Sequence, residues 1–522
     1  MSTNKYSHHD SNAGIVRTTS VLSLGTLSSR ALGFIRDVIL AKFLGTSFRA
    51  DAFFVAFRIP NLFRDILGEG GMNSSVVPVI AEYAQKEKKD LMAFLNAVFV
   101  LLLMALSLLT LLGIVFAPVV VRLIAPGFME DPAKLKLTIQ LTRIMFPYLI
   151  LIGLTAYGMG VLFVFRSFVV PAFSPCLLNL SIIASAFVSL AVPVDQVFCL
   201  AVGVLVGGVL QLGAHVTPVL SQGVRLQFPG TVNHPGVKKV GRLILPRLFG
   251  SGVYQLSVFV DTFCASLSSV VGTGGISAIY YANRVLQFPM SIFGVAVASA
   301  ILPTLSGFAA KSDLEEFRRT LGFALKSILF VMVPISVFLV LFSTPIIRLL
   351  FERGAFDAYS TAITSQALLF FALGLFGFAA SKVLVTAFHS LQDTATPAKV
   401  AALCLLVNVA LNFILMKPLK VGGIALASAI SSGINFFVLF SVLGGRLKGF
   451  SDGLLEYGSK VFLASITMGT ACYLLWQSLP AVPELARLFV VAIAGVAVFF
   501  QMCAVFKVHQ AQRILAWIFK RP

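Results

Sequence analysis

The feature that most constrains this chain is a series of long apolar runs, among them Ala93 to Ala117, Leu149 to Phe165 and Leu488 to Phe506. Each run reaches or approaches the roughly 20 residues that an α-helix needs to cross about 30 Å of hydrocarbon. Because 58% of the 522 residues are hydrophobic and only 12% are charged, a water-soluble globule could not bury them all. Backbone groups in lipid must bond internally, so the runs predict an all-α integral membrane protein.

Hydropathy predicts about fourteen transmembrane helices in this chain. They are expected near residues 15–42, 51–83, 91–121, 137–163, 168–192, 196–220, 240–268, 275–305, 317–343, 359–388, 396–416, 422–443, 456–478 and 485–506.

The net charge of +19 raises the question of nucleic-acid binding, which the location of the charges decides. With both termini inside, the inner loops hold roughly 21 Lys and Arg and the outer loops about 9. This asymmetry predicts that both termini are cytoplasmic. The excess positive charge then reports topology and contact with the anionic headgroups of bilayer lipids, and no nucleic-acid partner is expected.

The chain repeats itself at an offset of about 226 residues. The segment Ala52 to Arg58 matches Ala278 to Arg284, and Arg122 matches Arg348. A repeat of six helices keeps its orientation, so two lobes are expected about an axis along the membrane normal, with substrate between them. The predicted organisation is an N-terminal lobe at 1–222 (spans 1–6), a C-terminal lobe at 223–445 (spans 7–12), and two further spans with a basic interfacial tail at 446–522.

Charged residues inside the first predicted span occupy one side of it. Ser29, Arg30, Arg36 and Asp37 fall within an arc of about 120° at 100° per residue. Charges inside a membrane span are costly and usually face a cavity rather than lipid. The pattern therefore predicts a polar face turned toward a cleft.

The second predicted span also has polar side chains inside it, and Pro60 is expected to kink this helix. Its polar side chains are Asp51, Arg58, Asn61, Arg64, Asp65 and Glu69, and Arg284 stands at the position of Arg58 in the second lobe. A guanidinium grips phosphate bidentately and stays protonated, so arginines in a common cleft predict an anionic cargo. The carboxylates are expected to hold the arginines when no substrate is present.

Two carboxylates of the second lobe, Asp261 and Asp393, could together bind a cation such as sodium. The alternative is equally open: one would pack between helices and the other would cap a helix. The sequence contains neither a GxxxxGK[ST] phosphate-binding loop nor an HExxH zinc motif. A transporter without enzymatic machinery is therefore expected, with no cofactor other than a sodium ion.

Several long motifs resemble one known family, the MurJ (also called MviN) family of lipid II flippases. They are SSRALGFIRDVILAKFLG from Ser28, ADAFFVAFRIPNLFRDILGEGGMNSSVVPVIAEY from Ala50, YYANRVLQFPMSIFGVAVASAILPTLS from Tyr280, LFERGAF from Leu350 and QDTATP from Gln392. The resemblance covers about the first 450 residues, and the last two spans match mainly in number and hydropathy.

The resemblance implies fourteen helices of the multidrug/oligosaccharidyl-lipid/polysaccharide exporter superfamily, working by alternating access in the bacterial cytoplasmic membrane. The implied cargo is lipid II, the undecaprenyl-pyrophosphate-linked peptidoglycan precursor, and peptidoglycan-synthesis proteins are expected partners. The family's cavity arginines carry over onto Arg30, Arg36, Arg64 and Arg284, with Asp37, Asp51 and Glu69 in support. On the basis of the polar faces, Ser29 is added to the predicted substrate-binding residues. Arg58 and Asn61 are added to the predicted supporting residues of the cavity.

Two other readings of the same features stay open. The chain could flip another polyprenyl-linked glycan, or it could be a scaffold for envelope assembly that transports nothing. A scaffold should tolerate loss of the cavity arginines, whereas a flippase should not.

Overall fold

The computed structural model describes residues 8–64, 73–225, 227, 234–447, 449, 453–508 and 510–511. In residues 8–17, 19, 63–64, 73–74 and 244–254 it describes the backbone alone. Within these ranges every regular element is a helix and none is a strand. The prediction of an all-α membrane protein is confirmed.

The chain forms two compact units, Met1–Gln255 and Leu256–Pro522. The boundary between these units lies inside α10 (Pro235–Ser266). The predicted lobes at 1–222 and 223–445, with two further spans at 446–522, stay a prediction. The other helices of the first unit are α1 (His8–Leu44), α2 (Phe48–Arg64), α3 (Asn73–Tyr83), α4 (Lys88–Val115), α5 (Ala117–Ile124), the 3-10 helix η2 (Pro126–Glu130), α6 (Pro132–Met145), α7 (Tyr148–Val164), α8 (Val169–Val188) and α9 (Gln196–Ser221).

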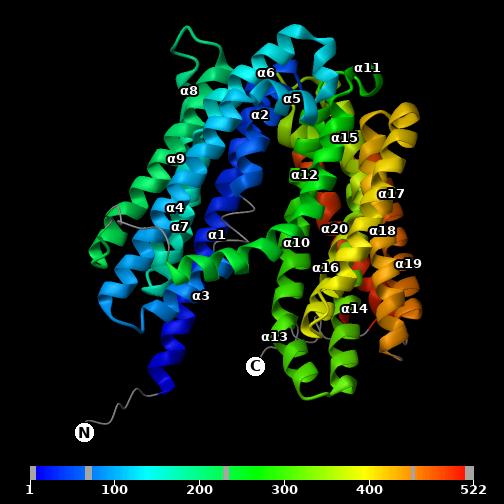
Figure 1. Ribbon diagram of the computed structural model, residues 1–522. Helices are drawn as coiled ribbons and strands as arrows, with labels where there is room; N and C mark the ends of the chain where they lie inside the picture. The colour runs from blue at the N-terminus through cyan, green and yellow to red at the C-terminus, as the bar shows by residue number, and fades with distance from the viewer. Residues whose placement is uncertain are drawn as a thin grey trace. The chain divides into compact units, whose positions relative to one another are not determined.

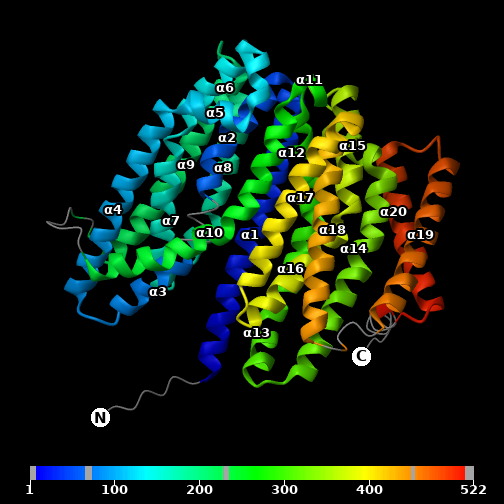
Figure 2. The ribbon, with the colours of Figure 1, turned by 45° about the vertical axis from the view of Figure 1, so that its right-hand side comes forward.

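The second unit contains two hairpins of long helices, α17 with α18 and α19 with α20, and α14 packs against α19 (Figure 2). Its elements are α11 (Ser268–Val271), α12 (Gly275–Pro289), the π-helix η3 (Met290–Val295), α13 (Ala296–Ala310), α14 (Leu314–Phe351), α15 (Ala358–Leu373), α16 (Leu375–Ser390), α17 (Ala395–Leu419), α18 (Val421–Arg446), α19 (Leu454–Ser478) and α20 (Glu484–Val505).

Ten helical segments among the described residues are long and apolar enough to cross a membrane, and the bent pair α15 and α16 would make an eleventh. These eleven coincide with predicted spans. The three remaining predicted spans fall on α1, on α2 with α3, and on α10. Helices α1 and α2 contain most of the charged residues that were predicted to line the cleft. The total of fourteen therefore stays a prediction.

The repeat is visible in the helix boundaries. Three pairs of helices begin 226 residues apart: α4 and α14 at Lys88 and Leu314, α6 and α15 at 132 and 358, and α8 and α17 at 169 and 395. The break between α4 and α5 at Phe116 and the kink of α14 at Phe342 have the same spacing. The predicted span 91–121 is wrong beyond this break, because Pro118 starts a new helix.

In the first unit, α4, α7, α8 and α9 run side by side (Figure 1). The core at one end joins α3, α4 and α7: the rings of Tyr83 and Phe94 stack with centroids 4.6 Å apart, and the hydroxyl of Tyr157 donates to the carbonyl of Leu95 at 3.1 Å. Large apolar side chains of α4 such as Leu108 and Leu111 stay exposed, as expected for a face against lipid.

In the second unit, the turn between α17 and α18 requires a close approach of backbone. A Cβ at Gly423 would lie 2.1 Å from the carbonyl oxygen of Leu415, which belongs to the main chain and cannot move aside. We expect Gly423→Ala to destabilise the protein by about 1–3 kcal/mol, the usual cost of overpacking.

The matched control lies in the same helix. A Cβ at Gly433 would meet nothing within 4 Å, so Gly433→Ala should leave stability unchanged or raise it by up to about 1 kcal/mol. Thermal unfolding of the purified protein in detergent compares the two variants. Equal unfolding temperatures for both would contradict the close packing at this turn.

Candidate functional site

Helix α1 is anchored to α8 by a buried polar cluster. Nε and Nη2 of Arg36 donate to Oδ1 of Asp37 at 3.0 and 2.7 Å, and Nη1 donates to Oδ1 of Asn179 on α8 at 3.0 Å. Nδ2 of Asn179 in turn donates to the backbone carbonyl of Ser29 at 3.1 Å. Arg36 is 5% exposed and Asp37 is fully buried, so this charge pair is shielded from solvent.

Small residues make this contact possible. A Cβ at Gly25 would lie 2.5 Å from the carbonyl oxygen of Ala172, which means that the backbones of α1 and α8 nearly touch there. Close approach through small residues is the usual mode of helix packing in membranes. Asn179 is a functional residue that the sequence reasoning missed, and its signal was an amide inside an otherwise apolar span.

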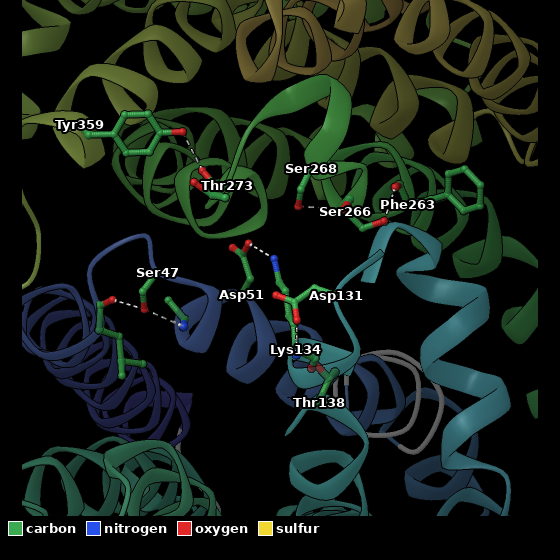
Figure 3. Close-up of polar contacts among 12 residues, drawn as sticks. Ser47, Asp51, Asp131, Lys134, Thr138, Phe263, Ser266, Ser268, Thr273 and Tyr359 are labelled. Carbon is green, nitrogen blue, oxygen red and sulfur yellow. Dashed lines mark hydrogen bonds and ion pairs between the residues drawn. The ribbon is translucent and has the colours of Figure 1, made fainter. Parts of the chain in front are cut away.

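A second buried ion pair joins α2 to α6 (Figure 3). Nζ of Lys134 donates to Oδ2 of Asp51 at 2.8 Å and lies 4.2 Å from the ring centroid of Phe128. The two side chains are 4% and 2% exposed. The side chain of Asp131 accepts from the backbone N–H groups of Ala133 and Lys134, so a helix cap fixes the turn that holds the lysine.

The sequence predicted that Asp51 helps to hold the cleft arginines, and this role stays a prediction. The structure adds a contact with a lysine, because a carboxylate in a dry interior is costly without a cation beside it. Lys134 was not predicted as a site residue because it lies just before the predicted span 137–163. A charged residue at such a place is expected to belong to a loop.

Four other predicted residues of the first unit are less buried than Arg36 and Asp51. Arg30 is exposed on α1 and Ser29 is partly buried; Arg58 and Asn61 are partly buried on α2. The side chain of Arg64 and the residues Asp65 and Glu69 lie outside the described residues, so their predicted roles stay predictions.

In the second unit, Arg284 lies on α12, six residues before the π-helix η3 begins at Met290. Nη2 of Arg284 donates to the hydroxyl of Tyr280 at 3.1 Å, Nη1 donates to Oε1 of Gln287 at 3.3 Å, and the guanidinium carbon lies 5.2 Å from the Tyr280 ring centroid. These contacts fix the orientation of the guanidinium on α12.

Asp261 on α10 belongs to a polar cluster with α17 and α18. Its Oδ1 accepts from Nδ2 of Asn412 at 3.0 Å and its Oδ2 from the hydroxyl of Ser428 at 3.0 Å. Asn408 connects both, since its Oδ1 accepts from Asn412 and its Nδ2 donates to Ser428. Oδ1 of Asn412 is buried without a hydrogen-bond partner.

Asp393 does not join this cluster, which corrects the prediction that it shares a cation with Asp261. Asp393 accepts from the backbone and hydroxyl of Thr396 and from Arg446, and these contacts hold the pKa of its carboxyl well below the usual range. From 396 to 412 is 16 residues of one helix, which separates the two sites by about 24 Å at 1.5 Å per residue. Asp393 is a helix cap.

The donor set around Asp261 suits a hard monovalent cation. It consists of one carboxylate, one hydroxyl and two amides, all capable of offering oxygen. Among the residues that the structure describes, no group of three or more His, Cys, Asp or Glu is placed to hold a metal, so a transition-metal site has no support there.

Solved structures of membrane transporters share this fold. An inward-facing multidrug resistance MATE family transporter of the MOP superfamily superimposes with a TM-score of 0.65 at 16% identity, over 81% of this chain and 95% of that one. At this identity the likeness concerns the fold alone. The helical architecture of this chain is thus shared with a solved membrane transporter.

Closer relatives identify the family. The model of the lipid II flippase MurJ family matches residues 40–495. "Lipid II flippase MurJ" of Burkholderia cenocepacia is 35% identical over 486 residues, which cover 90% of this chain and 92% of the relative. A solved "Lipid II flippase MurJ, inward closed conformation" has a TM-score of 0.80 at 28% identity, over 93% of this chain and 98% of that one. The chain belongs to the MurJ family.

The buried pair of Lys134 and Asp51 generates a test by mutation. Lys134→Met should destabilise the protein by about 3–5 kcal/mol, because it leaves a carboxylate buried without its partner. The double variant Asp51→Asn with Lys134→Met should recover most of this loss, since no charge remains to be buried. Thermal unfolding of the three proteins in detergent measures the effect, and a double variant as unstable as the single one would argue against the pair.

Proposed function

We propose that this chain moves lipid II from the inner to the outer leaflet of a bacterial cytoplasmic membrane, by alternating access of its two repeats. The observation that carries the proposal is the match to lipid II flippases over nearly the whole length of both chains. A match restricted to one unit would have implied only a shared fold. Both termini are assigned to the cytoplasm on the basis of the charge asymmetry of the loops.

The chemistry of the substrate fits the cations of the chain. Lipid II carries a pyrophosphate between a glycopeptide and a long polyprenyl chain, and planar guanidinium groups bind such phosphates through paired hydrogen bonds. Arg284 is suited to this contact, since Tyr280 and Gln287 hold its guanidinium in a fixed orientation. Arg30 and Arg64 are assigned to the same role.

Arg36 has a different part in this proposal. Its guanidinium already binds Asp37 and Asn179 inside the contact between α1 and α8. It therefore acts as a positioning residue, which keeps the polar side of α1 in a fixed orientation. Because Arg36 is only 5% exposed, a phosphate would reach it only if this helix contact rearranged.

Reconstitution in liposomes with labelled lipid II tests the function and the role of Arg284 together. Wild-type protein should exchange the lipid between leaflets, and Arg284→Ala should slow exchange by about tenfold or more, the usual loss for a hydrogen bond between charged groups. The matched control is Arg319→Ala, because this arginine is 80% exposed and pairs only with Glu316 three residues away.

The outcomes separate the candidate functions. Wild type that binds lipid II without exchanging it would favour the scaffold, and exchange of another polyprenyl-linked glycan in preference to lipid II would favour the broader flippase. Equal exchange by wild type and Arg284→Ala would remove Arg284 from the substrate site.

We also propose that sodium binds at Asp261, with Ser428, Asn408 and Asn412 supplying further oxygens. The orphaned Oδ1 of Asn412 supports this, because a buried acceptor without a partner is satisfied by a cation. Sodium bound there would neutralise Asp261 and link α10 to the hairpin of α17 and α18. The site would thereby couple the position of α10 to the sodium gradient.

The sodium proposal predicts different behaviour for the two carboxylates of the second unit. Replacing potassium by sodium at constant ionic strength should raise the unfolding temperature of the wild type, since a ligand at about 100 times its dissociation constant stabilises by about 2.7 kcal/mol. Asp261→Asn should abolish the shift, and Asp393→Asn should retain it. A sodium shift that survives in Asp261→Asn would refute the site.

A further inference from the structure

The second unit has a charged pocket at one end, and no residue of the candidate site lines it. It has a volume of about 400 Å³ and lies between the last turns of α14 and the turn that joins α19 to α20. That turn lies at the same end of the unit as α11 (Figure 2). The charge asymmetry of the loops assigns this end to the outer side of the membrane.

One wall of the pocket presents a guanidinium held in place. Nε and Nη2 of Arg487 donate to the carbonyl oxygen of Trp476, and the guanidinium carbon lies 4.0 Å from the Trp476 ring centroid. Among the described residues, Nη1 of Arg487 has no hydrogen-bond partner. The side chain is therefore oriented by its own helix hairpin, with donors left over for a ligand.

The opposite wall presents an ion pair that is open to exchange. Nη1 of Arg348 lies 3.3 Å from Oε1 of Glu484, and its Nε lies 3.4 Å from Oε2 of Glu352. Arg348 and Glu484 are 49% and 33% exposed, so both are accessible to a ligand. Counting the charged residues of the lining, two arginines face one glutamate.

The same two helices carry exposed apolar side chains. Leu474 on α19 and Leu485 and Phe489 on α20 are 62%, 51% and 62% exposed. A tryptophan near the end of such a span is typical of the depth at which lipid headgroups meet the acyl chains. The pocket thus offers anion donors and a carboxylate, on helices that also have apolar side chains exposed to lipid.

We propose that this pocket binds the headgroup of an amine-bearing phospholipid of the outer leaflet. Arg487 and Arg348 bind its phosphate, Glu484 binds its ammonium group, and the acyl chains lie on the apolar side of α19 and α20. Binding exchanges the Arg348–Glu484 contact for two contacts of the same kind, so no charge is left unpaired. The bound lipid would join α14 to the hairpin that lies outside the repeat.

The repeat itself provides a comparison within the chain. Arg122 of α5 corresponds to Arg348, and it is exposed near the end of the first unit. The first unit contains no counterpart of α19 and α20 among its described helices, and Trp476 and Arg487 belong to these two helices. Arg122 is therefore the matched control for a role that depends on the hairpin.

Native mass spectrometry of the purified full-length chain tests the proposal, with phosphatidylethanolamine and phosphatidylglycerol titrated separately. Wild type should prefer phosphatidylethanolamine. Arg487→Gln should weaken its binding about tenfold, the usual effect of losing a hydrogen bond between charged groups. Glu484→Gln should remove the preference over phosphatidylglycerol, and Arg122→Gln should change neither.

Three results would overturn the proposal: equal affinity of wild type for the two lipids, unchanged binding in Arg487→Gln, or displacement of the lipid by inorganic phosphate at the same concentration. The last would identify a site for free phosphate instead of a lipid. Arg348→Gln provides a second variant, since this half-exposed side chain takes no part in the contact between Arg487 and Trp476. If Arg487→Gln does not fold, unchanged binding in Arg348→Gln overturns the proposal equally.

Discussion

The interaction on which this structure depends is the pairing of charges inside a medium that cannot solvate them. A charge at the depth of the acyl chains costs several kcal/mol unless a partner satisfies it. Arg36 meets this requirement through Asp37 and Asn179, and Lys134 meets it through Asp51 and the ring of Phe128. These pairs also fix which helices touch, because each side chain with a partner on another helix ties two spans together.

The helices themselves could be predicted from hydropathy, and the repeat from short matches between the halves. Both predictions follow from local properties of the chain. The thickness of a bilayer sets the length of a span, and a duplicated segment retains the positions at which its helices are interrupted. The break at Phe116 and the kink at Phe342 show this, since each precedes a proline in its repeat. The Gly- and Pro-rich stretch after residue 222 predicted a joint between lobes, and α10 begins soon after it, at Pro235.

The partners of the charges could not be predicted, because they depend on helix packing. Asp51 and Lys134 are 83 residues apart, and Arg36 and Asn179 are 143 apart. A helical wheel gives the direction of a side chain but not the neighbour it meets. For the same reason Asp261 and Asp393 were assigned to one site, whereas the length of α17 keeps them apart. Polar residues inside apolar spans, such as Asn179 and Asn412, are the signal that would have improved the prediction.

The two repeats use equivalent helices for opposite chemistry. Helix α1 starts the first repeat and α10 the second, and an offset of 226 places Asp261 against Ile35, next to Arg36. In the first unit Arg36, one residue beyond this position, is a guanidinium bound by a carboxylate and an amide. In the second unit Asp261 is a carboxylate bound by an amide and a hydroxyl. The corresponding helices therefore carry opposite charges at neighbouring positions of the repeat. If sodium neutralises Asp261 while a phosphate engages the arginines, the two ligands can act on corresponding helices without competing for one site.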